Sequence, residues 1–218
     1  MQTHTLLRIA SAAAVSAGTP LPHWALEQLT RTPWVVVRRE RARAGCIPVG
    51  VRGRTRNERF AGWVTSTKVL ISLTPLELAV HRGWRTHPRR PVVPALDALD
   101  AVEAMMAAAG LGARWGPAGS VGFELASGCA TVRPQSDLDL ILQLPALLTR
   151  EAARALERRL QQLPVRADVL LETPDGGVAL TEYACGRGPF LLRTAGGPRL
   201  IASAPAAPAT IVYASASG

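Results

Sequence analysis

Residues 137–172 constrain the fold more than any other part of the chain. Residues 137–143 and 165–172 both alternate apolar and polar side chains with a period of two, which is typical of β-strands. Between them, residues 149–163 begin with Thr149 and carry an acid in the first turn, which indicates a capped helix. We therefore expect an α+β fold in which this part of the chain forms a mixed sheet flanked by helices.

The first part of the chain has a different pattern. Four short apolar runs separated by turn-forming residues predict β-strands at residues 34–37, 47–51, 60–64 and 69–73. The Thr-Pro-Leu-Glu sequence of residues 74–77 then has the features of a helix start. These elements predict a small, mostly β unit.

A proline-rich segment from His87 to Pro94 separates the two patterns, because prolines interrupt both helices and strand ladders. We predict a β-rich accessory domain over residues 1–90 and a second domain over residues 91–218. The second domain is expected to contain a helix at 95–110, an extended segment at 114–118, a short helix at 178–185, a hairpin with strands at 190–193 and 199–202, and a fraying tail at 203–218.

The charge balance predicts an anionic partner. The chain has 25 basic and 16 acidic residues, a net charge of +9, and Lys68 is the one lysine among the basic residues. Arg52 and Arg54 lie in a basic, glycine-containing stretch that could bind phosphate or could simply be a solvated face.

Other features exclude some classes of protein and favour a compartment. No apolar run reaches the roughly 18 residues that span a membrane, so a membrane-embedded protein is excluded. Three widely spaced cysteines without a Cys-x-x-Cys pair favour a reducing cytoplasm over a disulfide framework.

Two acidic residues in the strand predicted at residues 137–143 suggest a metal-binding or catalytic site. Asp137 and Asp139 are two residues apart and would share one face of the strand, while Leu138, Leu140 and Leu142 would face a core. Adjacent carboxylates repel one another, and a divalent cation between them relieves the repulsion. Mg²⁺ prefers oxygen ligands, so we expect it as the cofactor.

Two further features extend this candidate site. Asp168 lies on the polar face of the strand predicted at residues 165–172. It would complete a three-carboxylate cluster if this strand is a neighbour of the strand at residues 137–143. Gly119 and Ser120 form a small-residue turn that could approach a phosphate through its backbone and hydroxyl groups. Metal-binding carboxylates beside a phosphate-holding turn suit in-line displacement at phosphorus, with a carboxylate accepting the proton of the nucleophile.

These motifs resemble a known family. Gly119-Ser120, followed by Ser136-Asp137-Leu138-Asp139-Leu140, is similar to the signature of the nucleotidyltransferase superfamily. Within it, residues 119–128 and 132–139 resemble the malonate decarboxylase holo-(acyl-carrier-protein) synthases, also called phosphoribosyl-dephospho-CoA transferases. Residues 33–39 and 49–53 are similar to that family too, so the resemblance covers roughly residues 20–200.

The resemblance implies a nucleotidyltransferase-like second domain and a reaction. The family transfers the 2′-(5″-phosphoribosyl)-3′-dephospho-CoA group from 2′-(5″-triphosphoribosyl)-3′-dephospho-CoA to a serine of the acyl-carrier subunit of malonate decarboxylase, and pyrophosphate leaves. The N-terminal domain is then expected to help dock the carrier or the long substrate.

The resemblance also assigns roles to residues. Asp137 and Asp139 correspond to the metal-binding and catalytic carboxylates, and Asp168 is expected as the third. The phosphate-holding turn corresponds to Gly119 and Ser120. The expected substrate-binding set is Gly119, Ser120, Arg133, Ser136, Arg52 and Arg54.

Three alternatives remain open at this point. The same group could be loaded onto the acyl carrier protein of citrate lyase. A nucleotidyltransferase could act on a different hydroxyl acceptor. A basic nucleic-acid-binding module is the third alternative, but few aromatic residues and the lack of a groove-reading motif make nucleic acid an unexpected partner.

Overall fold

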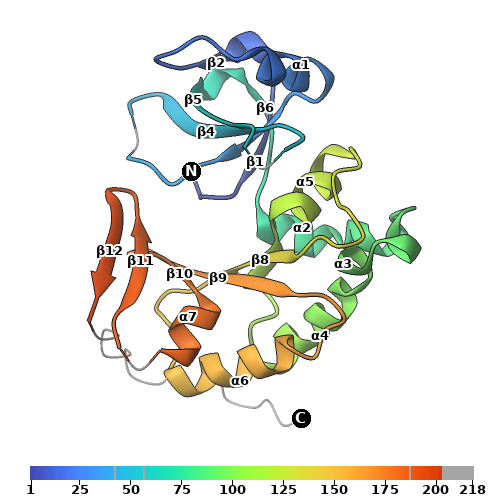
Figure 1. Cartoon of the computed structure of the whole chain (residues 1–218), viewed down its shortest axis with the longest axis vertical. Coiled ribbons are helices and arrows are strands. Elements are labelled where there is room, and N and C mark those ends of the chain that lie inside the picture. Colours follow the sequence, from blue (N-terminus) through green and yellow to red (C-terminus); the bar gives the residue numbers. More distant parts are fainter. Residues whose placement is uncertain (42, 56, 187, 203–218) are drawn as a thin grey trace, which may run out of the picture.

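Two six-stranded β-sheets organise the chain in the computed structural model, which describes residues 1–41, 43–55, 57–186 and 188–202. The first sheet and its helix form the upper half of Figure 1, and the second sheet with most of the helices forms the lower half. The predicted tail at 203–218 lies outside the described residues.

All strand pairs of the first sheet are antiparallel, in the order β2-β5-β4-β3-β1-β6. Its strands are β1 (Leu6–Ile9), β2 (Val15–Ser16), β3 (Trp34–Val37), β4 (Cys46–Arg52), β5 (Arg59–Thr65) and β6 (Val69–Leu73). Helix α1 (His23–Arg31) packs Ala25 and Leu29 into the core of this sheet. Short 3₁₀ turns lie at Ala12–Ala14 and Ser66–Lys68. The four predicted strands are confirmed, whereas β1, β2 and α1 are additions to the prediction.

Helices connect the two sheets. Helix α2 (Pro75–His81) starts with the predicted cap: Thr74 Oγ1 accepts from the Glu77 N–H at 3.1 Å, and the Glu77 carboxylate accepts from the Thr74 N–H at 2.7 Å. Two 3₁₀ turns follow at Gly83–Thr86 and Arg90–Val92. The predicted helix at 95–110 is present as two pieces, α3 (Pro94–Asp97) and α4 (Leu99–Ala108).

The second sheet is mixed, as predicted. Its order is β12-β11-β10-β9-β8-β7, and among its described strand pairs only β8 and β9 run parallel. Its strands are β7 (Trp115–Pro117), β8 (Leu138–Gln143), β9 (Ala167–Thr173), β10 (Gly176–Ala179), β11 (Phe190–Thr194) and β12 (Gly197–Ile201). Helix α6 (Arg150–Leu160) connects the parallel pair, and the Thr149 side chain caps it by accepting from the Ala152 N–H.

Helices cover one face of this sheet and leave the other to the first sheet. In Figure 1, α4, α6 and α7 (Leu180–Cys185) lie on the side of the second sheet that faces away from the first. The side chains of Leu138, Leu140 and Leu142 are at most 1% exposed and join the core on that side. Because side chains alternate along a strand, Asp139 and its register partner on β9 point to the opposite face, toward the first sheet.

Two local predictions were wrong. Gly119 and Ser120 do not form a turn but begin helix α5 (Gly119–Ser127). Two glycines, Gly119 and Gly122, lower the helix propensity of this stretch, but burial of Val121 and the close approach of Gly122 to the Pro117 carbonyl offset that deficit. The predicted helix at 178–185 starts later, because its first two residues pair with β9 as part of β10.

In the described part of the chain, no helix is long and apolar enough to cross a membrane.

Candidate active site

The parallel pairing of β8 and β9 brings two of the predicted carboxylates together. Asp139 and Asp168 are register partners on the neighbouring strands, and Asp137 lies directly before β8. Burial raises the pKa of Asp139 above its usual value, and the charges of Asp168 and Asp137 raise it further. Asp137 and Asp168 therefore both lie within electrostatic reach of Asp139, on the face that the sequence predicted.

Gly119 holds the start of α5 against Asp139. A side-chain Cβ at Gly119 would come within 1.8 Å of the Asp139 Oδ2, and the backbone φ of +56° also favours glycine. The Ala118 N–H donates to the Asp139 carbonyl at 2.8 Å. The predicted neighbourhood of the Gly-Ser motif and the carboxylates is thus present, with a helix N-terminus in place of a turn. Such a terminus carries free N–H groups and attracts anions.

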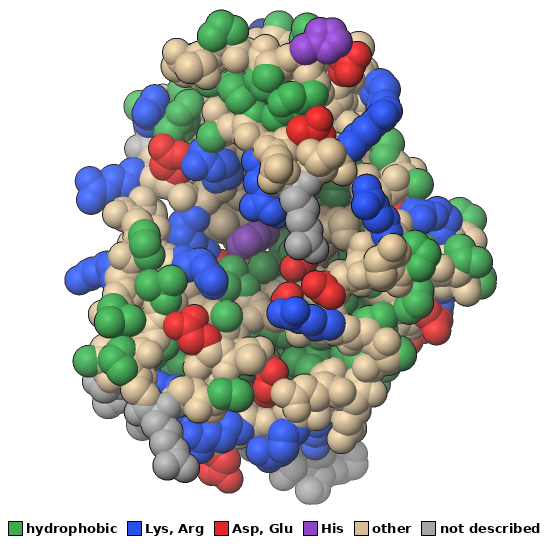
Figure 2. Space-filling model, in the orientation of Figure 1, with side chains coloured by type: hydrophobic (Ala, Val, Ile, Leu, Met, Phe, Trp, Pro, Cys, Tyr) green, Lys and Arg blue, Asp and Glu red, His purple; other side chains and the backbone are tan. Residues whose placement is uncertain are grey.

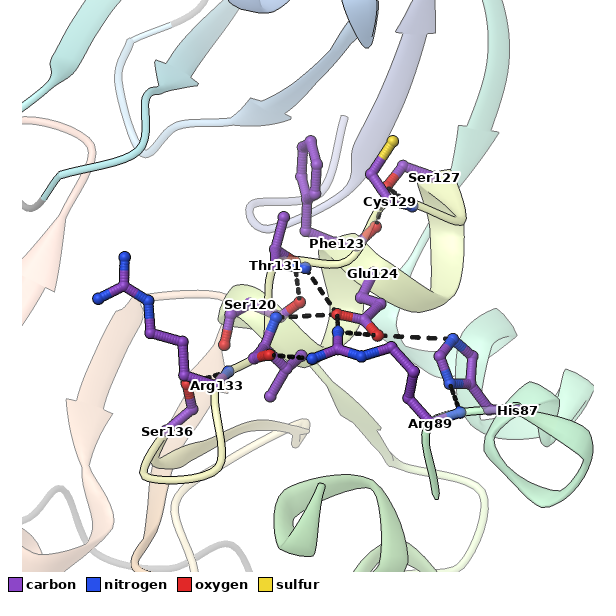
Figure 3. A network of polar contacts seen from close by, with 11 residues as sticks. His87, Arg89, Ser120, Phe123, Glu124, Ser127, Cys129, Thr131, Arg133 and Ser136 are labelled. Carbon is purple, nitrogen blue, oxygen red and sulfur yellow. Dashed lines mark hydrogen bonds and ion pairs between the residues drawn. The ribbon is translucent and has the colours of Figure 1, made fainter. Parts of the chain in front are cut away.

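A buried ion pair fixes α5 to the segment that precedes β8 (Figure 3). Glu124 of α5 is completely buried and accepts two hydrogen bonds from Arg89 Nη1 at 2.7 and 2.8 Å. The same carboxylate accepts from the backbone N–H groups of Thr131 and Val132 at 2.7 and 2.8 Å. Arg89 Nη2 donates to the Val132 carbonyl at 2.8 Å. His87 Nε2 lies 3.6 Å from Glu124 Oε1.

The sequence analysis did not predict this network, although the sequence contains a sign of it. Glu124 is the single acid in the otherwise uncharged segment of α5, and Arg89 lies in the stretch predicted as a linker. A lone acid on an apolar helix face needs a partner if it is buried. The network determines where the segment before Asp137 runs.

Ser136 and Arg133 lie in the turn that leads into Asp137. The Arg133 N–H donates to Ser136 Oγ at 2.9 Å, so the serine hydroxyl helps to fix the turn. The Arg133 side chain is exposed and extends away from Glu124 in Figure 3. The Ser120 carbonyl accepts from Thr131 Oγ1 at 3.1 Å, which ties the start of α5 to the segment that precedes this turn.

The carboxylates are not equally available to a cation. Asp168 is 42% exposed at its side chain and forms an ion pair with Arg166, with a distance of 3.1 Å between Arg166 Nη2 and Asp168 Oδ1. Within the ranges that the structure describes, no group of three or more His, Cys, Asp or Glu side chains is arranged to hold a metal ion. Asp137 and Asp139 offer hard oxygen atoms and a mutual repulsion that a cation would relieve, so the donor chemistry of this pair fits Mg²⁺.

The N-terminal half contributes positive charge to this site. The positive charge of Arg52, at the end of β4, opposes the rise in the pKa of Asp139, and His4 acts in the same direction, so both side chains are within electrostatic reach of that carboxylate. Arg54 is exposed in the turn that follows β4, and none of the described contacts connects it with the carboxylates. In Figure 2, basic side chains gather between the two halves, and acidic side chains lie among them.

A second ionic contact joins the halves at Glu172, near the end of β9. The Glu172 side chain is 10% exposed and accepts a hydrogen bond from Arg39 Nη2. His4 Nε2 lies 3.4 Å from the same oxygen. Burial alone would raise the pKa of Glu172, but the nearby His4 and the hydrogen bond from Arg39 hold it below its usual value. The amides of Gln2 and Gln143 add a hydrogen bond of 2.8 Å.

Comparison with known proteins covers both halves of the chain. The family model described as the phosphoribosyl-dephospho-CoA transferase MdcG C-terminal domain matches residues 79–204, and the model of the corresponding N-terminal domain matches residues 2–75. No solved structure matches the chain.

Three curated relatives illustrate the similarity, and each is named phosphoribosyl-dephospho-CoA transferase. The protein from Azotobacter vinelandii is 39% identical over 200 residues, which is 92% of each chain. The Pseudomonas putida protein is 42% identical over 183 residues, covering 84% of this chain and 85% of the relative. The Klebsiella pneumoniae protein is 38% identical over 205 residues, covering 86% of this chain and 97% of the relative. With both halves matched in order, the chain belongs to the phosphoribosyl-dephospho-CoA transferase family.

Proposed function

We propose that this chain transfers the 2′-(5″-phosphoribosyl)-3′-dephospho-CoA group from its triphosphate precursor to a serine of the acyl-carrier subunit of malonate decarboxylase. The observation that carries the proposal is the Asp137 and Asp139 pair beside the N-terminus of α5, with Gly119 as the point of closest approach. Family membership over both halves supports the same activity.

The reaction is a substitution at phosphorus. The serine oxygen of the carrier forms a bond to the phosphorus attached to the ribose, and the bond from that phosphorus to the pyrophosphate oxygen breaks. The serine proton passes to a carboxylate, and pyrophosphate leaves with the electron pair of the broken bond. Asp168 is the proposed acceptor of that proton, because it is the register partner of Asp139 and its side chain is 42% exposed.

Asp137 and Asp139 would hold Mg²⁺ on the face between the two halves. The bound ion supplies charge neutralisation for the triphosphate and polarises the phosphorus that is attacked. The N–H groups at the start of α5, together with Ser120, favour a phosphate oxygen at the same place. Arg52 lies opposite, from the other half of the molecule, and can neutralise the leaving pyrophosphate. Arg133, Ser136 and Arg54 complete the proposed substrate-binding set.

The proposed metal site has a test that does not depend on activity. Addition of Mg²⁺ should raise the Tm of the wild-type chain, because a ligand that binds the folded state stabilises it. Asp137→Asn and Asp139→Asn should lose this response, whereas Asp175→Asn, an exposed acid in the turn after β9, should keep it. If the Asp137→Asn chain responds to Mg²⁺ as strongly as the wild type, the proposed site is wrong.

The acceptor is tested with two carriers. The purified chain is incubated with Mg²⁺, the triphosphate precursor and the apo carrier subunit of either malonate decarboxylase or citrate lyase, and the intact mass of each carrier is measured. We expect the mass of the prosthetic group on the malonate decarboxylase carrier and none on a variant whose acceptor serine is alanine. Faster loading of the citrate lyase carrier would contradict the proposed acceptor.

A further inference from the structure

Two arginines face each other across neighbouring strands of the first sheet. Arg52 is the last residue of β4 and Arg59 is the first residue of β5, and the antiparallel register pairs them directly. Both residues are exposed. Residues that are directly opposite in an antiparallel pair have adjacent side chains on the same face of the sheet. Because like charges in this position repel one another, the pair lowers stability unless an anion binds between the two guanidinium groups.

This pair of arginines lies on the face of the first sheet that looks toward the second half of the chain. Val51 is buried in the core that the sheet shares with helix α1, so the next residue, Arg52, points to the opposite face. Val36 is the register partner of Gly50 and therefore shares the face of Arg52. Val36 packs against the same apolar cluster as Phe123 of α5, which belongs to the second half.

Within the part of the chain that the structure describes, the pair has no acidic partner. None of the ion pairs there includes Arg52 or Arg59. The acid that precedes Arg59, Glu58, lies on the α1 face of the sheet. A Cβ on Gly53 would lie 2.6 Å from Glu58 Oε2 and 2.9 Å from Trp24 Cε3 of α1.

Two arginines that follow β3 differ from this pair, because each already has an acidic partner. Arg38 pairs with Glu40 at 3.0 Å, and Arg39 pairs with Glu172. The charges of Arg52 and Arg59 are instead available to an anionic ligand.

The pair is also close to the proposed metal-binding carboxylates. Of the charges that act on the carboxyl group of Asp139, that of Arg52 has the largest effect on its pKa. Arg59 lies one strand farther along the same sheet, with about 5 Å between the Cα atoms of register partners. A ligand that reaches from Asp139 to Arg52 can therefore continue to Arg59.

The donor has a suitable anionic group at its reacting end. Its triphosphate carries two phosphates beyond the phosphorus that is attacked, and these two leave as pyrophosphate. A guanidinium group binds phosphate oxygens through two parallel hydrogen bonds. Two adjacent guanidinium groups can thus hold two consecutive phosphates, and the bound anion removes their mutual repulsion.

From this arrangement, and resting on the proposed function, we infer that Arg59 is a further substrate-binding residue and that Arg52 and Arg59 together bind the two terminal phosphates of the donor. Arg52 contacts the phosphate next to the attacked phosphorus, and Arg59 contacts the last phosphate. The N-terminal half then recognises the group that leaves, whereas the carboxylates of the second half act on the group that is transferred.

Binding of inorganic pyrophosphate to the full chain tests this inference directly. Its affinity is measured by calorimetry in the presence of Mg²⁺. We expect Arg59→Gln to bind pyrophosphate about tenfold more weakly than the wild type, a loss of about 1.4 kcal/mol, because one bidentate contact is removed.

Arg31→Gln is the matched control for this loss of one positive charge. Arg31 is exposed in the last turn of α1, which packs on the opposite face of the same sheet. Its affinity for pyrophosphate should stay within about twofold of the wild type. Equal affinities of Arg59→Gln and the wild type, or no measurable binding by the wild type, would overturn the inference.

The repulsion between the two arginines provides a second readout. At low ionic strength and without pyrophosphate, Arg59→Gln should raise the Tm by about 1–3 °C, because it removes a like-charge pair. Addition of pyrophosphate should raise the Tm of the wild type more than that of Arg59→Gln. A residue that only supports the fold would give a lower Tm when substituted. An equal response of both chains to pyrophosphate would contradict the assigned role.

Steady-state transfer kinetics separate binding from chemistry. Arg59→Gln should raise the KM for the triphosphate precursor by about tenfold and change kcat less, because the last phosphate is bound both before and during the reaction. A loss confined to kcat would contradict binding of the last phosphate by Arg59.

These results are distinguishable from a failure of the proposed function. If Arg59→Gln binds pyrophosphate like the wild type while the wild type still loads the carrier, the assignment of Arg59 alone is wrong. If pyrophosphate binding depends on Arg59 but the wild type loads neither carrier, the proposed transfer is wrong and the anion site is retained.

Discussion

Asp139 and Gly119 depend on each other at the scale of single residues. The carboxylate occupies the space that any side chain at position 119 would need, and the backbone there adopts a positive φ. Glycine is therefore required for two separate reasons, conformation and space. Gly110 requires glycine for its conformation alone, because its φ is +70° but a Cβ there would have no atom within 4 Å.

This pair of glycines makes a matched test. Gly110→Ala should lower the free energy of unfolding by about 1–2 kcal/mol, the typical strain of a left-handed residue with a side chain, and leave transfer intact. Gly119→Ala should lower it further and reduce transfer by more than about 100-fold, because the Asp139 carboxylate must move. Chemical denaturation and carrier loading measure the two effects. Equal effects of the two substitutions would contradict the close contact.

The raised pKa of Asp139 has a consequence for stability. Burial and the neighbouring carboxylates disfavour its ionised form in the folded state, so the unfolded chain releases this proton at a lower pH than the folded chain. The ionised group therefore opposes folding at pH values above the folded pKa, and the effect disappears below the usual pKa of aspartate.

We accordingly expect Asp139→Asn to raise the Tm at neutral pH, in the absence of Mg²⁺, while it removes transfer. The difference from the wild type should shrink as the pH falls through the raised pKa toward the usual aspartate value. Thermal unfolding followed over a pH series measures it, with Asp175→Asn as the control for a generic loss of one negative charge. A lower Tm for Asp139→Asn at neutral pH would mean that this carboxylate stabilises the fold instead.

At the scale of elements, helix α5 depends on Glu124. The carboxylate is completely buried and satisfies Arg89 as well as two backbone N–H groups. Glu124→Gln would leave the guanidinium without its counter-charge, and we expect a loss of about 3–5 kcal/mol in the free energy of unfolding. Glu27→Gln, at an exposed residue paired with His23 at 3.7 Å, should change it by less than about 1 kcal/mol. Denaturant unfolding of both variants measures this difference. Small and similar losses in the free energy of unfolding for Glu124→Gln and Glu27→Gln would show that the network does not stabilise the helix.

The sequence predicted elements where one periodicity dominates. The strands β3 to β6, β8 and β9 and the cap of α6 follow from alternation and capping residues that lie within a few positions of one another. Helix α5 was not predicted because its glycines are typical of a turn. The reason for these glycines is tertiary: Gly122 packs closely against the Pro117 carbonyl, and Gly119 packs closely against Asp139. Residues 178–179 were assigned to a helix because their pairing with β9 is a tertiary contact.

The same limit applies to the site. The shared face of Asp137, Asp139 and Asp168 follows from strand phasing alone. Which of the many arginines faces these acids does not, because Arg52 and Arg54 are equivalent in the sequence pattern. Of these two, Arg52 is the one whose charge acts on the pKa of Asp139 in the arrangement of the two halves.

At the scale of the whole molecule, we expect catalysis to require both halves, because the charge of Arg52 acts on Asp139. Arg52→Gln should reduce transfer by about tenfold or more, because a cation facing the reacting phosphates is removed. Arg54→Gln makes the same change two residues away and should have a smaller effect. Steady-state kinetics with the triphosphate precursor measures both variants. A larger loss at Arg54 would mean that the halves meet differently in the working enzyme.

The central claim is that Asp137 and Asp139 form the working centre, and intact-mass analysis of the carrier subunit tests it most directly. With Mg²⁺ and the triphosphate precursor, the wild-type chain and Asp175→Asn should add the prosthetic group to the carrier, whereas Asp137→Asn and Asp139→Asn should add none while their circular dichroism spectra match the wild type. Full loading of the carrier by either of the last two variants would contradict the account.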